Sequence, residues 1–385
     1  MRSRWPSDLA LVAATVMATV AVQRQLKQNR GQPYAASGSP ADPSGHAGRA
    51  EMIATMGNGR LARAPWQIPA KGWKDILFRT YDQINQDRLL ATAAGVVFYG
   101  LLAIFPAITA LVSSYGLFAD PSTISDNLQS LAMMLPAGSF SVVQDQIARV
   151  LAKGNTTLGW TFAFGLLIAI WSANAGMKAV IDALNVVYEE DEKRGFIKLN
   201  LVSLSFTVAA LAGIMVMISA VIAVPLVLQR LGLGERGEML LAYGRWPVLG
   251  SLLLFALAVL YRYGPSRATP RWQWLSVGTV AAVLLWLAGS ALLSWYLSNF
   301  EDYNATYGSL GAAIGLMTWM WMSAIIVLCG AELNSEIEHQ TMVDSTEGVP
   351  SPLGTRGATM ADTVGEARDG FGDALILRHA IGSST

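Results

Sequence analysis

Six long stretches of this chain carry no charged side chain, and this pattern limits the possible folds more than any other feature of the sequence. They are Leu89–Ala119, Gly154–Met177, Leu199–Gln229, Trp246–Tyr261, Trp272–Phe300 and Tyr303–Ala331. Five exceed the roughly 20 apolar residues that a helix needs to cross about 30 Å of hydrocarbon. The fourth is shorter, but Arg245 and Arg262 flank it, and their long side chains can extend toward the headgroups.

Hydrocarbon offers no hydrogen-bond partner to a backbone amide, so an open chain crosses it only as α-helices. The composition agrees, since 53% of the residues are hydrophobic and only 14% are charged, against about 25% charged in soluble domains. We therefore predict an all-α, polytopic integral membrane protein. Its core would be a six-transmembrane-helix bundle with amphipathic flanking helices.

The charge balance and the cysteine count exclude further classes. The formal net charge is zero, so no basic field favours a nucleic-acid partner. Cys329 is the single cysteine, so no disulfide can form within the chain.

The two ends differ from the core in composition. Leu9–Val22 makes residues 1–30 a weak N-terminal hydrophobic anchor, which either crosses the membrane or lies in its interface. Residues 31–70 are rich in Gly, Ala, Ser and Pro, and we expect a disordered linker. Residues 71–341 form the predicted membrane domain, and residues 342–385 are predicted to be a disordered C-terminal tail.

Basic residues near the predicted spans set the expected orientation. Twelve lie before the first span or in the second-to-third and fourth-to-fifth loops, and five lie in the opposite loops. Because Lys and Arg are enriched in cytoplasmic loops, we expect both flanks of the core in the cytoplasm. The first group is Arg60, Arg63, Lys71, Lys74, Arg79, Arg88, Lys193, Arg194, Lys198, Arg262, Arg267 and Arg271.

Amphipathic segments flank the spans. Trp73 to Arg88 has an apolar face that favours an in-plane helix leading into the first span. After that span, residues 124–135 and 140–150 carry two further apolar stripes and predict a helical hairpin. The hairpin either docks on the bundle or covers a lipid-filled or substrate-filled cavity.

One polar stripe runs along the second predicted span. Asn174, Lys178, Asp182 and Asn185 are spaced so that they share one helix face. Lys178 lies about 16 Å from the end of the helix near Glu189, at about 1.5 Å per residue. Either an ion pair with Asp182 or a water-filled cavity could offset the burial of its charge, about 2.5–3.5 kcal/mol at mid-bilayer. Two interpretations of the stripe stay open. It is a cationic site that binds an anionic headgroup or a coupling ion, or it is a structural pair in which the lysine snorkels to the interface.

The last predicted span ends in a polar turn. Glu332, Ser335, Glu336 and His339 share a face at helical spacing. Acidic residues at a helix C-terminus oppose the macrodipole, so cationic partners are expected. The candidates are the Lys178 stripe or Arg267 and Arg271; a solvated terminal turn is the alternative.

Small residues and prolines mark packing and bending positions. Gly308, Gly311 and Gly315 open the sixth span with spacing that lets two helix backbones approach closely. Pro106 and Pro225 are predicted to kink the first and third spans.

Motifs for catalysis are missing from the sequence. With only three histidines and one cysteine, no cluster of metal ligands is evident, and no nucleotide-binding glycine loop or nucleophile elbow is present. We therefore expect no catalytic residues, no metal and no cofactor.

Five strings of unusual residues occur in the predicted membrane domain: Gly95–Pro106, Ile170–Lys178, Ala183–Glu190, Tyr303–Ala313 and Gly330–Asn334. In these strings the chain resembles the YihY/BrkB family of bacterial inner-membrane proteins, which was once labelled ribonuclease BN. The resemblance spans about Gly72–Thr341. It implies six transmembrane helices in the bacterial cytoplasmic membrane.

The favoured function is binding or transport of an amphipathic or anionic molecule, such as a lipid, by a protein that is not an enzyme. Lys178 and Asn174 would contact a headgroup, with Asp182 and Glu332 balancing charge. A structural or scaffolding membrane protein is the alternative, and a ribonuclease is less favoured. The expected partners are membrane lipids, with a second copy of the chain or an unknown membrane protein also possible.

Overall fold

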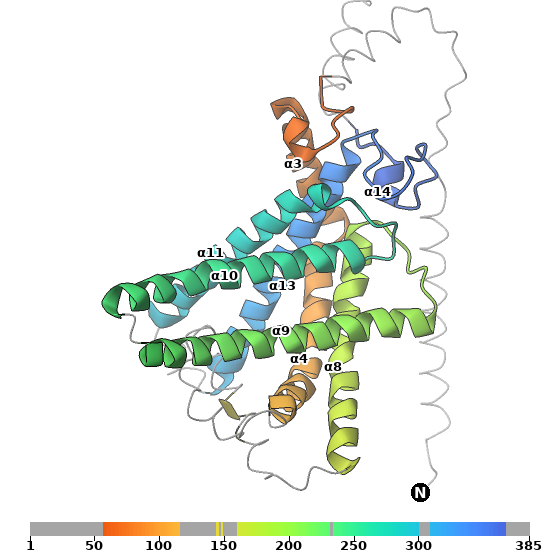
Figure 1. The fold of residues 1–385 in the computed structure, drawn as a ribbon. Coiled ribbons are helices and arrows are strands. Elements are labelled where there is room, and N and C mark those ends of the chain that lie inside the picture. Colours follow the sequence, from red (N-terminus) through yellow and green to blue (C-terminus); the bar gives the residue numbers. More distant parts are fainter. Residues whose placement is uncertain are drawn as a thin grey trace, which may run out of the picture. The chain divides into compact units, whose positions relative to one another are not determined.

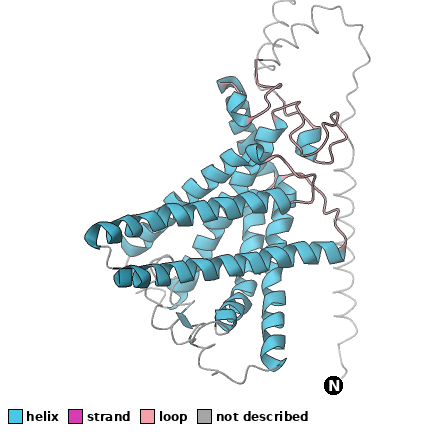
Figure 2. Cartoon of the chain, in the orientation of Figure 1, coloured by secondary structure: helices cyan, strands magenta, loops and turns pink. Residues whose placement is uncertain are grey.

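The computed structural model describes residues 57–115, 144, 145, 148, 160–231, 234–299 and 309–366. All of them belong to one compact unit, Ala54–Thr385. Its secondary structure is helical (Figures 1 and 2), which confirms the all-α prediction. The helices are α3 (Ala70–Gln86), α4 (Leu89–Tyr115), α8 (Trp160–Val187), α9 (Phe196–Leu231), α10 (Gly234–Tyr263), α11 (Ser276–Asn299), α13 (Ser309–His339) and α14 (Thr359–Asp362), with short 3₁₀ turns η1 (Pro65–Gln67) and η2 (Trp272–Leu275).

Each uncharged stretch of the sequence lies mainly within one helix. Five helices, α4, α8, α9, α11 and α13, are long and apolar enough to cross a membrane. In α10 the apolar part, Pro247–Tyr263, is shorter, so the predicted count of six spans is approximate. The protein is a helical membrane bundle.

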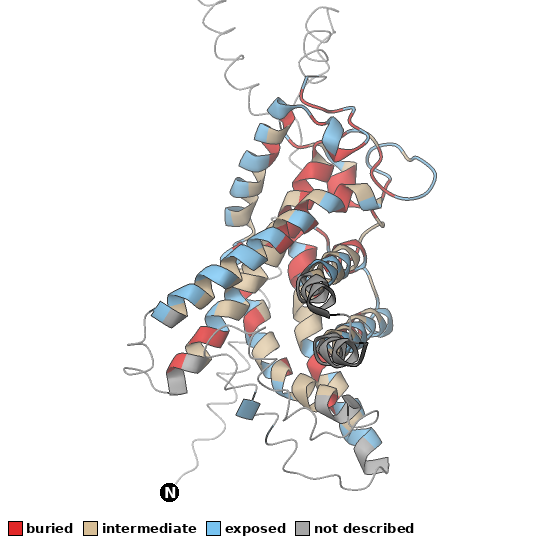
Figure 3. Cartoon of the chain, turned by 60° about the vertical axis from the view of Figure 1, so that its left-hand side comes forward, coloured by how far each residue is buried: buried red, intermediate tan, exposed pale blue. Residues whose placement is uncertain are grey.

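The surface of the spans is apolar. Only 17% to 28% of the most apolar window of each candidate span is buried inside the protein, so most of these side chains need an apolar environment from outside. Exposed examples are Phe105 on α4, Leu167 on α8, Leu201 on α9 and Leu284 on α11. In Figure 3 buried residues gather toward one end of the bundle, while exposed residues follow the helices away from it.

The helices pack mainly in pairs. α4 packs along α8, α11 packs along α13, and α13 also contacts α4. In Figure 1, α9 and α10 run steeply across α8 and α4. The apolar core includes Leu89, Leu184, Leu257, Ala282 and Leu328, contributed by α4, α8, α10, α11 and α13.

α11 and α13 approach each other closely at two glycines. A Cβ added to Gly278 would overlap the carbonyl oxygen of Gly330, and a Cβ added to Gly330 would lie 2.6 Å from that of Ala282. The backbone N–H of Gly278 donates a hydrogen bond to Asn334 Oδ1 at 2.8 Å. Only glycine leaves room for this approach.

The predicted packing glycines and prolines lie at the other end of the spans or outside the described part. Gly311 and Gly315 are buried, while Gly308 lies outside the described residues. Helix α4 is continuous through Pro106 and α9 through Pro225, so neither proline ends its helix. The close-packing role and the kinks stay predictions. Leu9–Val22 and nearly all of the predicted hairpin lie outside the described residues.

The predicted disorder of the C-terminal tail is wrong for residues 342–366. Together with Thr341 they form the C-terminal segment, which packs on the loop between α10 and η2. The backbone N–H of Arg271 donates to Ser345 O at 2.9 Å, and that of Glu347 donates to Thr269 O at 2.9 Å. The polar composition of the tail suggested disorder, but these side chains and amides find fixed partners in the folded bundle.

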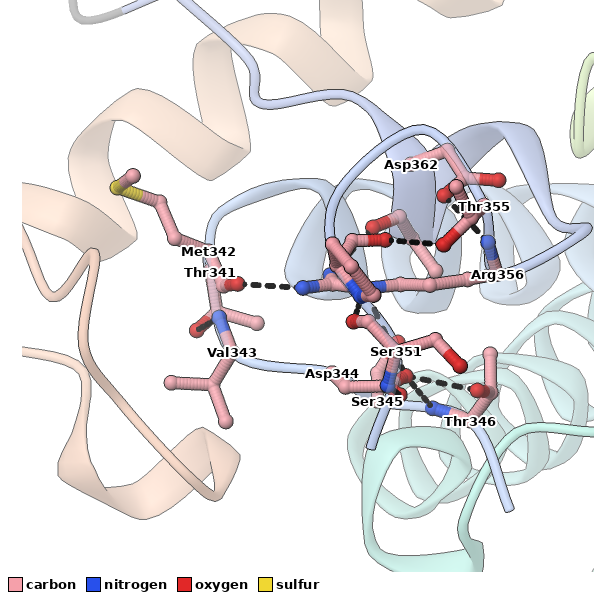
Figure 4. A network of polar contacts seen from close by, with 12 residues as sticks. Thr341, Met342, Val343, Asp344, Ser345, Thr346, Ser351, Thr355, Arg356 and Asp362 are labelled. Carbon is pink, nitrogen blue, oxygen red and sulfur yellow. Dashed lines mark hydrogen bonds and ion pairs between the residues drawn. The ribbon is translucent and has the colours of Figure 1, made fainter. Parts of the chain in front are cut away.

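Arg356 holds this segment together (Figure 4). Its guanidinium donates to the carbonyls of Met342, Ser351 and Ala361, at 2.8, 3.0 and 2.6 Å. The side chain of Asp344 accepts hydrogen bonds from Thr346 and from the Ser351 amide. Burial raises the pKa of Asp344, but these bonds and the nearby charge of Arg356 outweigh it and lower that pKa.

The expected linker is also partly ordered. Residues 57–69, the N-terminal segment, contain buried Arg60, Ala62 and Ile68. The backbone N–H of Met342 donates to Arg60 O at 2.8 Å, and Thr341 Oγ1 donates to Ala62 O at 2.7 Å. The disordered linker therefore does not extend to residue 70, because this segment finds backbone partners just beyond the end of α13.

Four segments meet at this end of the bundle: the N-terminal segment, the α8–α9 loop, the α10–η2 loop and the C-terminal segment. Ser266 N–H donates to Asn185 Oδ1 at 2.8 Å, and Thr359 N–H donates to Glu190 at 2.7 Å. We call it the basic end. The loops that are predicted from their Lys and Arg content to share one side of the membrane lie together here.

Candidate functional site

Lys178 lies half-buried on α8, beside the start of α9. Its ammonium lies 5.6 Å from the ring centroid of Trp171 and 6.0 Å from that of Phe196. Within the described part of the chain, no carboxylate lies within ion-pair distance of Lys178, and Asp182 is exposed. The expected pair of Lys178 with Asp182 is therefore not formed, because the charge rests on aromatic faces instead.

Asn174 does not share this surface. It is 1% exposed, and its Oδ1 accepts a hydrogen bond from Thr207 Oγ1 of α9 at 3.2 Å. Thr207 also donates to Ser203 O, one turn earlier. Asn174 therefore joins α8 to α9 instead of facing outward with Lys178, and its contact with a headgroup stays a prediction.

Asn185 has a structural position near the end of α8. Its Oδ1 accepts from the Ser266 amide, and its Nδ2 donates to Glu192 at 3.0 Å. Glu192 also accepts two hydrogen bonds from the Arg194 guanidinium, each 2.7 Å long. Burial raises the pKa of Glu192, but the hydrogen bonds from Arg194, Asn185 and Ser266 outweigh it and lower that pKa to about 2.

Helix α8 ends in a left-handed turn at Glu189, close to α13, where Ser335 Oγ donates a hydrogen bond to Val187 O at 3.2 Å. Glu189 has φ 51°, and the Glu190 amide donates to Asn185 O at 2.8 Å, closing the turn as a Schellman end does. Such a turn usually has glycine at the left-handed position. The turn brings Tyr188 into the core, where it is fully buried.

Glu336 of α13 is paired with Arg79 of α3. The distance from Arg79 Nε to the carboxylate is 2.6 Å, and the Glu336 side chain is 1% exposed. His339 Nδ1 lies 3.6 Å from the same carboxylate. The expected cationic partner exists, but it is Arg79 and not the Lys178 stripe. The position of Arg79 on an amphipathic helix that leads into the first span is a sequence signal for such a partner.

Glu338 of α13 is paired with Arg267 from the α10–η2 loop. The nitrogen–oxygen distance is 2.6 Å, and the two side chains are 1% and 0% exposed. The Arg267 guanidinium also lies 4.0 Å from the ring centroid of Tyr188. Burial lowers the pKa of Arg267, but Glu338 and Tyr188 outweigh it and raise that pKa. Arg267 was an expected partner for this helix end, but Glu338 was not among the acids predicted to share its face.

Glu332 has no such partner. It is 0% exposed, and neither of its carboxyl oxygens has a hydrogen bond among the described residues. Tyr188 lies near enough for the charge of Glu332 to act on it, whereas Asn334 points to α11, where its Oδ1 accepts a hydrogen bond from the Gly278 amide. We call Glu332 and Tyr188 the Glu332 cluster. Tyr188 is not among the predicted site residues, although it lies in a string that carries the family resemblance.

The predicted site residues therefore separate into three places. Lys178 faces outward beside α9, Asn174 and Asn185 join helices and loops, and Glu332 and Glu336 lie in the buried polar layer at the basic end. In the part of the chain that the structure describes, no three His, Cys, Asp or Glu residues gather in a way that could hold a metal ion.

Comparison with known proteins places this bundle among bacterial membrane proteins. The family described as Virulence factor BrkB matches residues 80–352. The chain is 30% identical over 251 residues to the ribonuclease-like protein YfkH of Bacillus subtilis, covering 63% of this chain and 88% of that protein.

Two further relatives are UPF0761 membrane proteins. The protein of Alkalilimnicola ehrlichii is 28% identical over 267 residues, covering 66% of this chain and 56% of that protein. The protein of Vibrio campbellii is 25% identical over 295 residues, covering 74% of this chain and 89% of that protein. No solved structure matches the chain.

Proposed function

The chain belongs to the BrkB family of membrane proteins, and from this premise we propose that it binds an anionic amphipathic molecule, such as a phospholipid, and moves it across or within the bacterial cytoplasmic membrane. In this proposal the protein is not an enzyme, and both flanks of its core lie in the cytoplasm. Membrane lipids are its partners. A second copy of the chain or another membrane protein is a further possible partner.

The observation that carries the proposal is the environment of Lys178. A half-buried ammonium on a membrane-spanning helix contacts two aromatic rings and has no carboxylate within ion-pair distance among the described residues. Aromatic faces attract a cation by about 0.5–2 kcal/mol but leave its charge uncompensated. A phosphate group is the natural counterion for such a lysine.

The surface around Lys178 suits the rest of a lipid molecule. Trp171 is 55% exposed, and Phe196 and Ile197 at the start of α9 are 76% and 82% exposed. The first amides of α9 also carry the positive end of its dipole, which favours an anion at this place. A headgroup at Lys178 would therefore have acyl chains beside exposed apolar side chains.

A structural or scaffolding protein is the second candidate. Its support is the number of polar side chains engaged in internal contacts: Asn174 with Thr207, Asn185 with Glu192 and Ser266. The relative from Bacillus subtilis is named ribonuclease-like. We favour that activity least for this chain, because its sequence offers no evident set of metal ligands for phosphodiester hydrolysis.

The test uses the full-length protein in liposomes that contain fluorescent anionic phospholipid. Replacing Lys178 with Ala should weaken lipid binding roughly fivefold, because one lysine near an anionic surface contributes about 1 kcal/mol. Lys178→Arg should keep most of the binding. Lys71→Ala is the matched control, since Lys71 is an exposed lysine on α3.

Lipid transport is measured in the same liposomes by quenching of the outer leaflet. The Lys178→Ala protein should transport more slowly than wild type, while the Lys71→Ala protein should match wild type. Unchanged binding and transport in Lys178→Ala would refute the assignment. If Lys178→Ala also lost thermal stability in detergent, the structural role would be favoured instead.

A further inference from the structure

Glu332 is a buried carboxyl with nothing to balance it. It lies on α13, with 0% of its surface exposed and both oxygens without a hydrogen bond among the described residues. Two arginines at this helix end pair with other acids, since Arg79 pairs with Glu336 and Arg267 pairs with Glu338. Glu332 is therefore unlike the other buried acids of this helix end.

The charges that act on Glu332 share its sign. The carboxylates of Asp87, Glu189 and Glu336 lie near enough to repel a negative charge there. Helices α4 and α11, which also pack on α13, contribute no charged side chain. The titratable and charged groups on the elements around this position are Arg79 and Asp87 from α3 and its end, Tyr188 and Glu189 from the end of α8, Tyr261 and Arg267 from α10 and its loop, and Cys329, Glu336, Glu338 and His339 from α13.

An ionised carboxylate in this position is unfavourable. Removing an unpaired charge from water is so costly that such a group takes up a proton instead. A neutral carboxyl also suits its neighbours, because it has one O–H to donate and a carbonyl oxygen to accept. Tyr188 Oη, on which the charge of Glu332 acts, can donate or accept a hydrogen bond.

We propose that the Glu332 cluster is a proton-binding site: Glu332 carries a proton in the folded protein, in a buried position near Tyr188 at the basic end of the bundle. The ligand is a single proton, taken up by a carboxylate oxygen from water and released to water. This proposal goes beyond lipid binding and does not depend on it, because Lys178 and its aromatic neighbours form no part of the cluster.

Infrared difference spectroscopy on the full-length protein in lipid nanodiscs tests the proposal directly. A protonated carboxyl has a carbonyl stretch that is separate from the bands of carboxylates and shifts in D₂O. At pH 7 this band should be present in wild type and lost in Glu332→Gln. Glu336→Gln is the matched control, since Glu336 is an ionised partner of Arg79, and it should keep the band.

Thermal unfolding is a second measurement, and it shows whether the Glu332→Gln protein is still folded. The amide in Glu332→Gln mimics the protonated acid, so this variant should be at least as stable as wild type, with a margin that grows as the pH rises. Glu336→Gln should be less stable than wild type, because Arg79 loses its partner. A Glu332→Gln protein as destabilised as Glu336→Gln would overturn the proposal.

Two further outcomes also contradict it. If wild type shows no protonated-carboxyl band at pH 7 that Glu332→Gln removes, then Glu332 is ionised. If sodium chloride stabilises wild type but not Glu332→Gln, compared with choline chloride, a metal cation and not a proton occupies the cluster. Lipid binding should be unchanged in Glu332→Gln. If the lipid-binding test at Lys178 failed, the infrared result for Glu332 would still stand.

Discussion

Individual polar residues at the basic end are buried with their partners. Arg267 and Glu338 are almost fully enclosed, and Ser345 Oγ donates a further hydrogen bond to Glu338 at 2.6 Å. Desolvation offsets much of the attraction within a buried pair, so the pair itself adds little to stability. Loss of one member is different, because the other charge then stays buried without compensation.

Arg267→Met should therefore destabilise the protein by about 3–5 kcal/mol. Lys193→Met is the comparison and should cost less, because Lys193 is 56% exposed and its buried partner Glu190 keeps a hydrogen bond from the Thr359 amide at 2.7 Å. Unfolding in a mild detergent, followed by circular dichroism, measures both. Equal losses in the two variants would show that Glu338 finds another partner or water.

Helices α11 and α13 are the elements whose contact depends most directly on small residues. Gly278 and Gly330 face each other with backbone atoms in contact distance, and Asn334 bonds to the Gly278 amide beside them. Lipid tails are as apolar as the helices, so close packing and interhelical hydrogen bonds are what holds such a pair together.

Gly278→Ala should push the two helices apart and destabilise the bundle by about 1–3 kcal/mol, as overpacking does. The matched control is Gly213→Ala on α9, where an added Cβ meets nothing within 4 Å. That variant should be neutral or slightly stabilising, since alanine favours a helix by up to about 1 kcal/mol over glycine. If Gly278→Ala were also neutral, α11 and α13 would not be as close as described.

At the scale of the whole molecule, segments far apart in the sequence meet at the basic end. The isolated bridge between Pro270 and Thr346 joins the α10–η2 loop to the C-terminal segment, and the bond from the Met342 amide to Arg60 O joins that segment to the N-terminal segment. These contacts require the three to lie on the same side of the membrane. The arginines of the N-terminal segment and of the α10–η2 loop favour the cytoplasmic side.

Cysteine labelling tests this topology in a Cys329→Ser background. Val349→Cys and Lys193→Cys should resist a membrane-impermeant maleimide in spheroplasts and react only after permeabilisation. Asp145→Cys, at an exposed helical position between α4 and α8, should react without permeabilisation. Labelling of Val349→Cys and Lys193→Cys from opposite sides would contradict the arrangement described here.

Part of the candidate site was accessible from the sequence. Charged residues in or beside apolar spans can be identified from the sequence alone, and Glu332, Glu336, Arg267 and Lys178 are of this kind. The sequence does not predict which of them pair. Arg79 and Glu336 are 257 positions apart, and Asp182 is exposed although it shares a spacing with buried Asn174 and Asn185.

That the chain forms helices in a membrane follows from its local composition, because the energy of placing charge or bare backbone in hydrocarbon depends on each segment alone. Which acid is paired and which is not follows from the folded arrangement. So do the contact between Gly278 and Gly330 and the packing of residues 342–366 against the bundle. Those features depend on which surfaces of distant segments face each other, and spacing along one helix does not contain that information.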